Sequence, residues 1–322
     1  MISQHFIDPS HTGWLRLSPD GAYVGLGGPG ANFRLYKNGN ILLRASIPFE
    51  VEVQDLAFRT VDGITVGLAL LSYGPGTRLY FIDLVNQIGA PTMEVSDASS
   101  IAYDSSGENL LVGYQNGTVL EYPVNSSGAI DKGEASSSVY RRRFTLPVDA
   151  RVLKVLATDS PEHILAYNDH GQLFSLTTSS AEEVKSAAGE SLNIKIVKQH
   201  PFLPVLAVLQ RNGQLFIKEW NSGVVIELAL NDPSKVVNSL SFTPDGDVVV
   251  GTGSEVVQIY LAVNSEMTAP AEDTAASADA APADIDPRSL LDVGSYEIYR
   301  SAKPLVLAEL SPFTGHLVAL YQ

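Results

Sequence analysis

The feature that most constrains the fold of this chain is a turn that recurs seven times, each time after a short apolar run. The turns begin at residues 18, 60, 104, 159, 200, 243 and 311, so four of the six intervals are 41 to 44 residues long. Their residues favour turns because proline fixes φ, glycine accepts positive φ, and aspartate and serine bond the nearby backbone. Asp20-Gly21 and Asp245-Gly246 are the clearest examples, and we expect them to be structural repeat turns.

A second turn follows most of the first ones, and runs of apolar or alternating residues lie between the turns. Asn212-Gly213, for example, stands between two such runs, which is a strong hairpin signal. Four short strands in about 40–45 residues are typical of one blade of a β-propeller. We therefore expect residues 1–322 to form a single all-β domain, a β-propeller of about seven four-stranded blades. A two-domain β-sandwich is the alternative, but sandwiches do not repeat two kinds of turn in fixed phase.

The segment Asn212–Gly223 resembles the repeat of WD40-type propellers, with Trp220-Asn221 where that family carries Trp-Asp. The chain has no Trp-Asp dipeptide, and its one Gly-His pair, Gly315-His316, stands at a different place in its repeat. The resemblance therefore implies a divergent WD40-like propeller in which Trp220 has a structural role. In size and economy the chain is also similar to the small open propellers of vesicle coats and nuclear pores, which implies a protein-binding function.

The last repeat is incomplete. Pro304–Leu310 predicts an innermost strand and 316–321 a second one, while Ile2–Ile7 is expected to add one more at most. Since proteins cover or pair an exposed strand edge, two interpretations stay open. Either the last blade is short, or trimmed from a longer chain, or a partner chain donates the missing strand by β-augmentation. In the second case the expected partner-binding residues are His316, Leu317, Val318, Leu320 and Tyr321.

Two other segments stand out from the repeat. The acidic, Ala/Pro/Asp-rich insertion at 264–294 has few large apolar side chains, so we expect a flexible segment within blade six. It is either a plain surface loop or a tether for a basic partner. Arg141, Arg142 and Arg143 form the one concentrated positive site. They either decorate an outer edge strand, where charge prevents sheet-to-sheet pairing, or bind an acidic segment of a partner.

Composition and motifs exclude several classes of function. The formal net charge of −15 argues against binding to a nucleic acid, which needs a basic stripe. The chain has no cysteine, no apolar run long enough to cross a membrane, and no signal peptide, so we favour an intracellular location. Its six histidines lack metal-ligand spacing, and no nucleophile motif occurs. We therefore expect no catalytic residue, no metal and no cofactor.

We expect a non-catalytic scaffold for protein–protein interaction, a subunit of a multiprotein assembly. The fold alone does not select this function, because one fold serves many. One alternative is an enzyme or small-ligand binder that uses the central channel of the propeller. Another is a structural component of a coat or virion.

Overall fold

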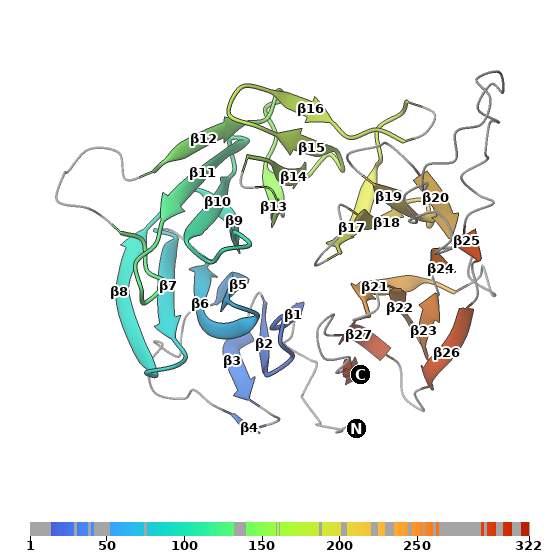
Figure 1. Cartoon of the computed structure of the whole chain (residues 1–322), viewed down its shortest axis with the longest axis horizontal. Coiled ribbons are helices and arrows are strands. Elements are labelled where there is room, and N and C mark those ends of the chain that lie inside the picture. The colour runs from blue at the N-terminus through green and yellow to red at the C-terminus, as the bar shows by residue number, and fades with distance from the viewer. Residues whose placement is uncertain are drawn as a thin grey trace, which may run out of the picture.

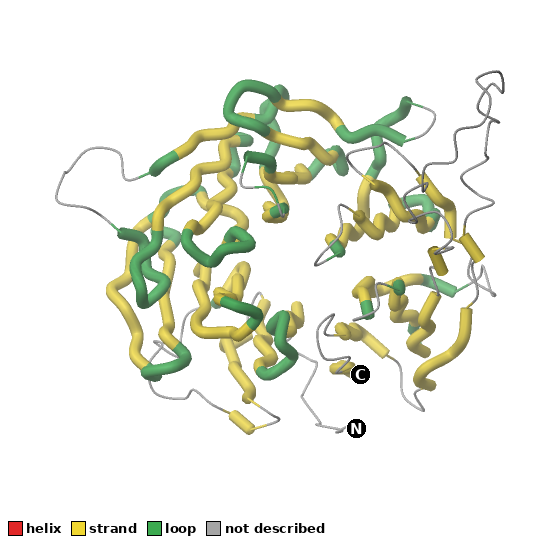
Figure 2. The backbone as a smooth tube through the Cα atoms, viewed as in Figure 1, coloured by secondary structure: helices red, strands yellow, loops and turns green. Residues whose placement is uncertain are grey.

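The computed structural model of the chain is a radial array of antiparallel β-sheets (Figure 1). Its described residues are 14–28, 31–37, 40–41, 52–73, 76–131, 140–158, 160, 162–186, 189–200, 205–219, 225–228, 235–243, 247–253, 255–259, 262–263, 291–292, 295–300, 305–310 and 317–321. The predictions for Trp220, Asp245, Gly246 and His316, and for most of the insertion at 264–294, lie outside these residues. The described residues form strands, turns and loops and no helix (Figure 2).

Six sheets have four strands each, and the strands follow one another in chain order from the innermost to the outermost. Blade one contains β1 (Trp14–Leu17), β2 (Tyr23–Gly28), β3 (Ala31–Lys37) and β4 (Asn40–Ile41), and blade two contains β5 (Val53–Val61), β6 (Ile64–Ser72), β7 (Arg78–Asp83) and β8 (Ile88–Glu94). Blade three contains β9 (Ala98–Tyr103), β10 (Asn109–Tyr114), β11 (Thr118–Pro123) and β12 (Arg142–Thr145), and blade four contains β13 (Val152–Ala157), β14 (Ile164–Asn168), β15 (Leu173–Leu176) and β16 (Ala181–Glu183). Blade five contains β17 (Ile194–Gln199), β18 (Val205–Gln210), β19 (Leu215–Glu219) and β20 (Val225–Leu228), and blade six contains β21 (Val237–Phe242), β22 (Val248–Thr252), β23 (Glu255–Ile259) and β26 (Ser295–Arg300).

The predicted all-β propeller is confirmed, but the expected number of blades is wrong. The structure has six four-stranded blades instead of about seven, because the last repeat contributes a sheet of two strands, β27 (Leu305–Leu310) and β28 (Leu317–Tyr321). This sheet lies between blade six and blade one, where β27 packs against β21, β22 and β1 (Figure 1). A second short sheet pairs β24 (Ala262–Val263) with β25 (Leu291–Asp292).

The hydrophobic core is divided among six clusters, each of which lies between two neighbouring sheets. Between blades two and three, for example, the buried side chains of Leu79 and Phe81 belong to one cluster with Ile101. The last cluster joins Val256 of blade six to Leu305 of β27. Because each blade buries its faces only against its neighbours, stability comes from the stack of blades and not from one central core.

The predicted repeat turn at Asp20-Gly21 forms, and it also joins two blades. Gly21 has φ of 70°, and its N–H donates to the Ser18 carbonyl at 2.8 Å. The Asp20 carboxylate accepts hydrogen bonds from the Ser18 hydroxyl at 2.7 Å, from Ala22 N at 3.1 Å and from Thr65 N of blade two at 2.9 Å. Burial alone would raise the pKa of Asp20, but these hydrogen bonds outweigh it and hold the pKa below its usual value.

A β-bulge recurs at the second residue of the innermost strand in blades two to six and in the β27–β28 sheet. The bulged residues are Gln54, Ser99, Leu153, Lys195, Asn238 and Val306. Bulges re-aim side chains and bend the strand. Four of these side chains accordingly donate a hydrogen bond to a backbone carbonyl at the start of the next innermost strand. The pairs are Gln54 to Ser99 O, Ser99 to Val152 O, Lys195 to Val237 O and Asn238 to Leu305 O, at 2.6 to 3.1 Å.

The residue after each bulge makes a second connection between blades. We call the third residues of the innermost strands the third-residue layer: Arg16, Asp55, Ser100, Lys154, Ile196, Ser239 and Leu307. Where this side chain has an acceptor oxygen, the oxygen accepts a hydrogen bond from the backbone N–H of the fourth residue of the next innermost strand. The pairs are Asp55 with Ile101 N, Ser100 with Val155 N and Ser239 with Ala308 N, at 2.8 to 3.2 Å. At these junctions neighbouring sheets are thus joined by a hydrogen bond at the third-residue layer.

Candidate functional site

The arginine tract lies at the outer edge of blade three, with Arg142 and Arg143 in β12. Arg142 Nε donates to the Oε2 atom of Glu121 at 2.5 Å, and the Glu121 side chain is 4% exposed. Arg141 Nη1 donates to Asn109 Oδ1 at 3.1 Å. Arg143 is exposed and has no hydrogen bond or ion pair with any described residue. The three arginines are therefore not equivalent: Arg142 compensates a buried charge of its own blade, whereas Arg143 remains open to a partner.

The predicted partner-binding residues Leu317, Val318, Leu320 and Tyr321 lie on β28, whereas His316 lies outside the described residues. The backbone of Val318, Leu320 and Tyr321 pairs with β27, and the half-buried Leu317 packs against the cluster between blade six and this sheet. In the described part of the chain β28 pairs with β27 alone. The structure therefore places these residues in a strand that carries an edge.

A cluster of charged side chains on the innermost strands is the feature that sequence reasoning missed. Asp55 of blade two is buried, and its two carboxylate oxygens lie 2.8 and 2.7 Å from the Nζ atom of Lys154 in blade four. Arg16 Nη2 of blade one lies 3.9 Å from Asp55 Oδ1. The carboxylate also accepts hydrogen bonds from Leu56 N and Ile101 N, each at 3.0 Å. Asp55 thus connects the innermost strands of the first four blades, although Asp55 and Lys154 are 99 residues apart in the sequence.

The charges of this cluster perturb one another. The pKa of Lys154 is lowered to about 8, mainly by burial and to a smaller extent by the cations Arg16 and Lys198, while Asp55 opposes the shift. Tyr167 lies opposite Lys154 in the register of β13 and β14. Burial raises the pKa of Tyr167, which also lies within the electrostatic range of Arg16 and Asp55. The side chains of Arg16 and Lys154 are 32% and 19% exposed, so the cluster is in contact with solvent.

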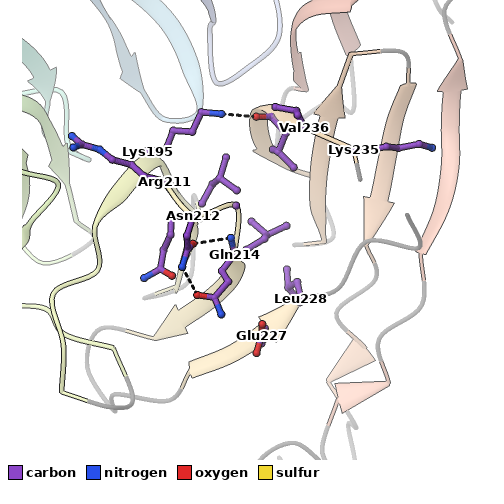
Figure 3. A pocket seen from close by; sticks show the side chains of 13 residues that line it. Lys195, Arg211, Asn212, Gln214, Glu227, Leu228, Lys235 and Val236 are labelled. Carbon is purple, nitrogen blue, oxygen red and sulfur yellow. Dashed lines mark hydrogen bonds between the residues drawn. The ribbon is translucent and has the colours of Figure 1, made fainter. Parts of the chain in front are cut away.

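A separate pocket of about 610 Å³ lies between blades five and six, beside the turn at Arg211–Gln214 (Figure 3). Lys195 crosses it to donate to Val237 O at 3.1 Å, and Lys235 forms an ion pair with Glu255. Among the described lining residues Glu227 is the one carboxylate, and there is no histidine.

The described residues contain no group of three or more His, Asp or Glu side chains arranged to hold a metal ion. None of them forms a helix that could span a membrane. Asp55 and Lys154 touch, but a carboxylate saturated by four hydrogen bonds is a poor general base. In the described part of the molecule the interactions of these charged groups are therefore mainly between blades.

No family model and no curated protein matches the sequence. Among solved structures, the β-propeller domain of Cps50 (Swd1) from Myceliophteria thermophila superposes with a TM-score of 0.62 at 13% sequence identity. The match covers 98% of this chain and 95% of that domain. At this level of identity the likeness concerns the fold, and it agrees with the repeat that the sequence displays. The chain therefore has the β-propeller fold.

Proposed function

We propose that the chain is a non-catalytic scaffold for protein–protein interaction, a subunit of an assembly in which a partner adds a strand to β28. One observation carries this proposal. The β27–β28 sheet has the register of the first two strands of a blade, including the bulge at its second residue, and no described strand pairs with the far edge of β28. The backbone donors and acceptors of an open edge are a ready template for a strand from another chain.

The docking of this sheet on blade six supports the proposal. Ala308 N donates to Ser239 Oγ at 3.2 Å, the same connection that joins complete blades. A Cβ added to Gly251 would lie 3.3 Å from the Ala308 Cβ, and one added to Gly113 would lie 2.9 Å from Val155 at the equivalent place between blades three and four. The β27–β28 sheet is therefore seated as a blade is seated, so its open edge lies where a third strand belongs.

The six third strands define what a partner must supply. In each blade, the third-residue layer pairs with a residue of the second strand. That residue pairs in turn with a leucine or valine of the third strand. These residues are Leu35, Leu79, Val119, Leu173, Leu215 and Val256, all 3% exposed or less. The next residue is always large or branched and apolar: Tyr36, Tyr80, Leu120, Phe174, Phe216 and Val257. A donated strand should carry the same pair of residues, with the leucine or valine opposite Leu320.

The proposed contacts are His316 and the β28 residues Leu317, Val318, Leu320 and Tyr321 for the donated strand. Arg141 and Arg143 are the proposed contacts for an acidic segment of a partner. Arg142 is less suited to this role, because it already pairs with Glu121.

A fused surrogate strand tests whether the edge accepts a third strand. By register Gln322 corresponds to Tyr73 of blade two, so a copy of residues 74–83 appended after Gln322 would place its leucine opposite Leu320. Burial of a leucine and a tyrosine should raise the free energy of unfolding by about 3 kcal/mol. The matched control is the same fusion with Leu79→Asp and Tyr80→Ser in the copy. Equal stability of the two fusions would show that β28 does not accept a strand.

The same pair of proteins tests the role in the cell of origin. A partner that uses the β28 edge should co-purify stoichiometrically with the original chain and with the control fusion, but not with the surrogate-strand fusion. A stable chain that recovers no stoichiometric partner under any of these conditions would refute the scaffold proposal.

A further inference from the structure

Two cations of the third-residue layer share one carboxylate. Arg16 and Lys154 both face Asp55, and their nitrogens lie 3.9 and 2.8 Å from the same Oδ1 atom. The chain as a whole has a net charge of −15, so an excess of positive charge at the innermost strands is contrary to its overall balance. A structural ion pair accounts for Lys154, but Arg16 shares the same carboxylate at the longer distance of 3.9 Å.

Asp55 cannot satisfy Arg16 as well. An ionised carboxylate has about four acceptor positions, and Asp55 already accepts four hydrogen bonds, two from Lys154 and two from backbone N–H groups. The distance of 3.9 Å from Arg16 is beyond hydrogen-bond length. The other contacts of Arg16 are a hydrogen bond from Nη1 to Leu15 O at 3.1 Å and the ring of Trp14, 5.9 Å away.

Several donors around the cluster have no acceptor among the described residues. The third N–H of Lys154, the remaining N–H groups of Arg16 and the hydroxyl of Tyr167 are all in this state. The Nε atom of Arg151, just before β13, is buried without a hydrogen-bond partner. Arg151 Nε is the buried donor in this group, and a buried donor without a partner is costly, whereas the donors of Arg16 and Lys154 belong to partly exposed side chains.

We propose that Arg16 of blade one and Lys154 of blade four bind a small oxyanion, a phosphate or carboxylate group, beside Asp55 at the innermost strands. The two cationic nitrogens lie within about 7 Å of each other, because both are tied to Asp55 Oδ1, and two oxygens of one oxyanion can bridge such a gap. Partial exposure of both side chains leaves a route from solvent. Asp55 has a positioning role, because it fixes the Lys154 ammonium.

The electrostatic neighbours agree with this assignment. Burial is the largest cause of the lowered pKa of Lys154 and Asp55 opposes it, while Arg16 and Lys198 each add a smaller lowering effect. An oxyanion would reverse this effect, because it favours the charged form of the lysine. The proposed site is independent of the β28 edge, so its test needs no partner protein.

The test is isothermal titration calorimetry of the full chain with inorganic phosphate and, separately, with citrate, at constant ionic strength. Arg16→Met should weaken binding at least about tenfold, since it removes a charge-assisted hydrogen bond but none of the groups that hold Asp55. Lys154→Met should weaken it as strongly. Arg34→Met removes the same charge from an exposed position on the third strand of blade one and should leave the affinity unchanged.

The two probes distinguish the chemical sources. Binding of phosphate alone assigns a phosphorylated ligand, and binding of citrate alone assigns a carboxylate. Absence of binding of both up to about 10 mM would overturn the proposal. An equal loss of affinity in the Arg16 and Arg34 variants would also overturn it, because it would show a non-specific effect of charge.

Discussion

Asparagine at position 55 is the most direct test of how the innermost strands are held together. Asp55→Asn preserves the shape of the side chain but removes its charge and replaces one acceptor oxygen by a donor NH2 group. The wild-type carboxylate accepts Leu56 N, Ile101 N and two bonds from Lys154, at 2.7 to 3.0 Å. In the variant at least one buried N–H loses its acceptor, and the Lys154 ammonium loses its counter-ion.

Removal of one member of a buried ion pair costs about 3–5 kcal/mol, and we expect Asp55→Asn to lower the free energy of unfolding by this amount at pH 7. Because Lys154 has a pKa of about 8, the loss should be smaller at pH 9, where this lysine is largely neutral. Urea denaturation of Asp55→Asn, Lys154→Met and the double variant measures the coupling directly. We expect the double variant to lose less than the sum of the two single losses, by about 1–3 kcal/mol. Losses that add within about 0.5 kcal/mol would refute the view that Asp55 and Lys154 act as one unit.

Three further predictions concern the charge, the packing and the outer edge. Because the pKa of Lys154 falls from 10.5 to about 8 on folding, the unfolded chain binds more protons between these values, and the free energy of unfolding should rise from about pH 8 to pH 10. Above pH 10 the free energy of unfolding should fall again, because the buried tyrosines have raised pKa values. A wild-type profile that is flat below pH 10 would contradict the assignment to Lys154. A rise that persists in Lys154→Met would contradict it as well. Gly113→Ala places a Cβ 2.6 Å from a valine side chain of blade four and should cost about 1–3 kcal/mol in thermal unfolding, whereas Gly253→Ala meets nothing within 4 Å and should be close to neutral. Arg142→Met leaves the buried Glu121 carboxylate unpaired and should lower the free energy of unfolding in urea by about 3–5 kcal/mol. Arg143→Met should change it by less than about 0.5 kcal/mol. Equal losses in the two variants would refute the structural role of Arg142.

The sequence was sufficient to predict the fold because turn chemistry is local. The turn at Asp20-Gly21 needs only its own residues to form, and such turns set the spacing of the strands. The interactions between blades are different, since they depend on residues from separate repeats. The bulged positions are occupied by Gln54, Ser99, Leu153 and three further residue types, so no shared residue marks them. The pairing of positions 55 and 154 is also invisible without the curvature of the ring.

The number of blades was missed for a similar reason. The number of turn motifs gives the number of hairpins, not the number of complete blades. The last motif does correspond to a hairpin, in which β27 pairs with β28. Whether a hairpin becomes a blade depends on the pairing of its outer edge, which the turn does not determine. In blade six, β23 pairs with β26 across the intervening residues, so the fourth strand comes from beyond the insertion.

The third-residue layer also indicates where the chain departs from its own structural rule. Asp55, Ser100 and Ser239 accept an N–H from the next innermost strand, but Arg16, Lys154, Ile196 and Leu307 occupy the same layer and have no acceptor atom. The junctions that follow blades one, four and five therefore lack that connection. A residue that weakens a repeated interaction without a packing benefit is more often kept for function than for stability. Of the four residues without an acceptor, Arg16 and Lys154 are the charged ones, and both face Asp55 at the proposed oxyanion site.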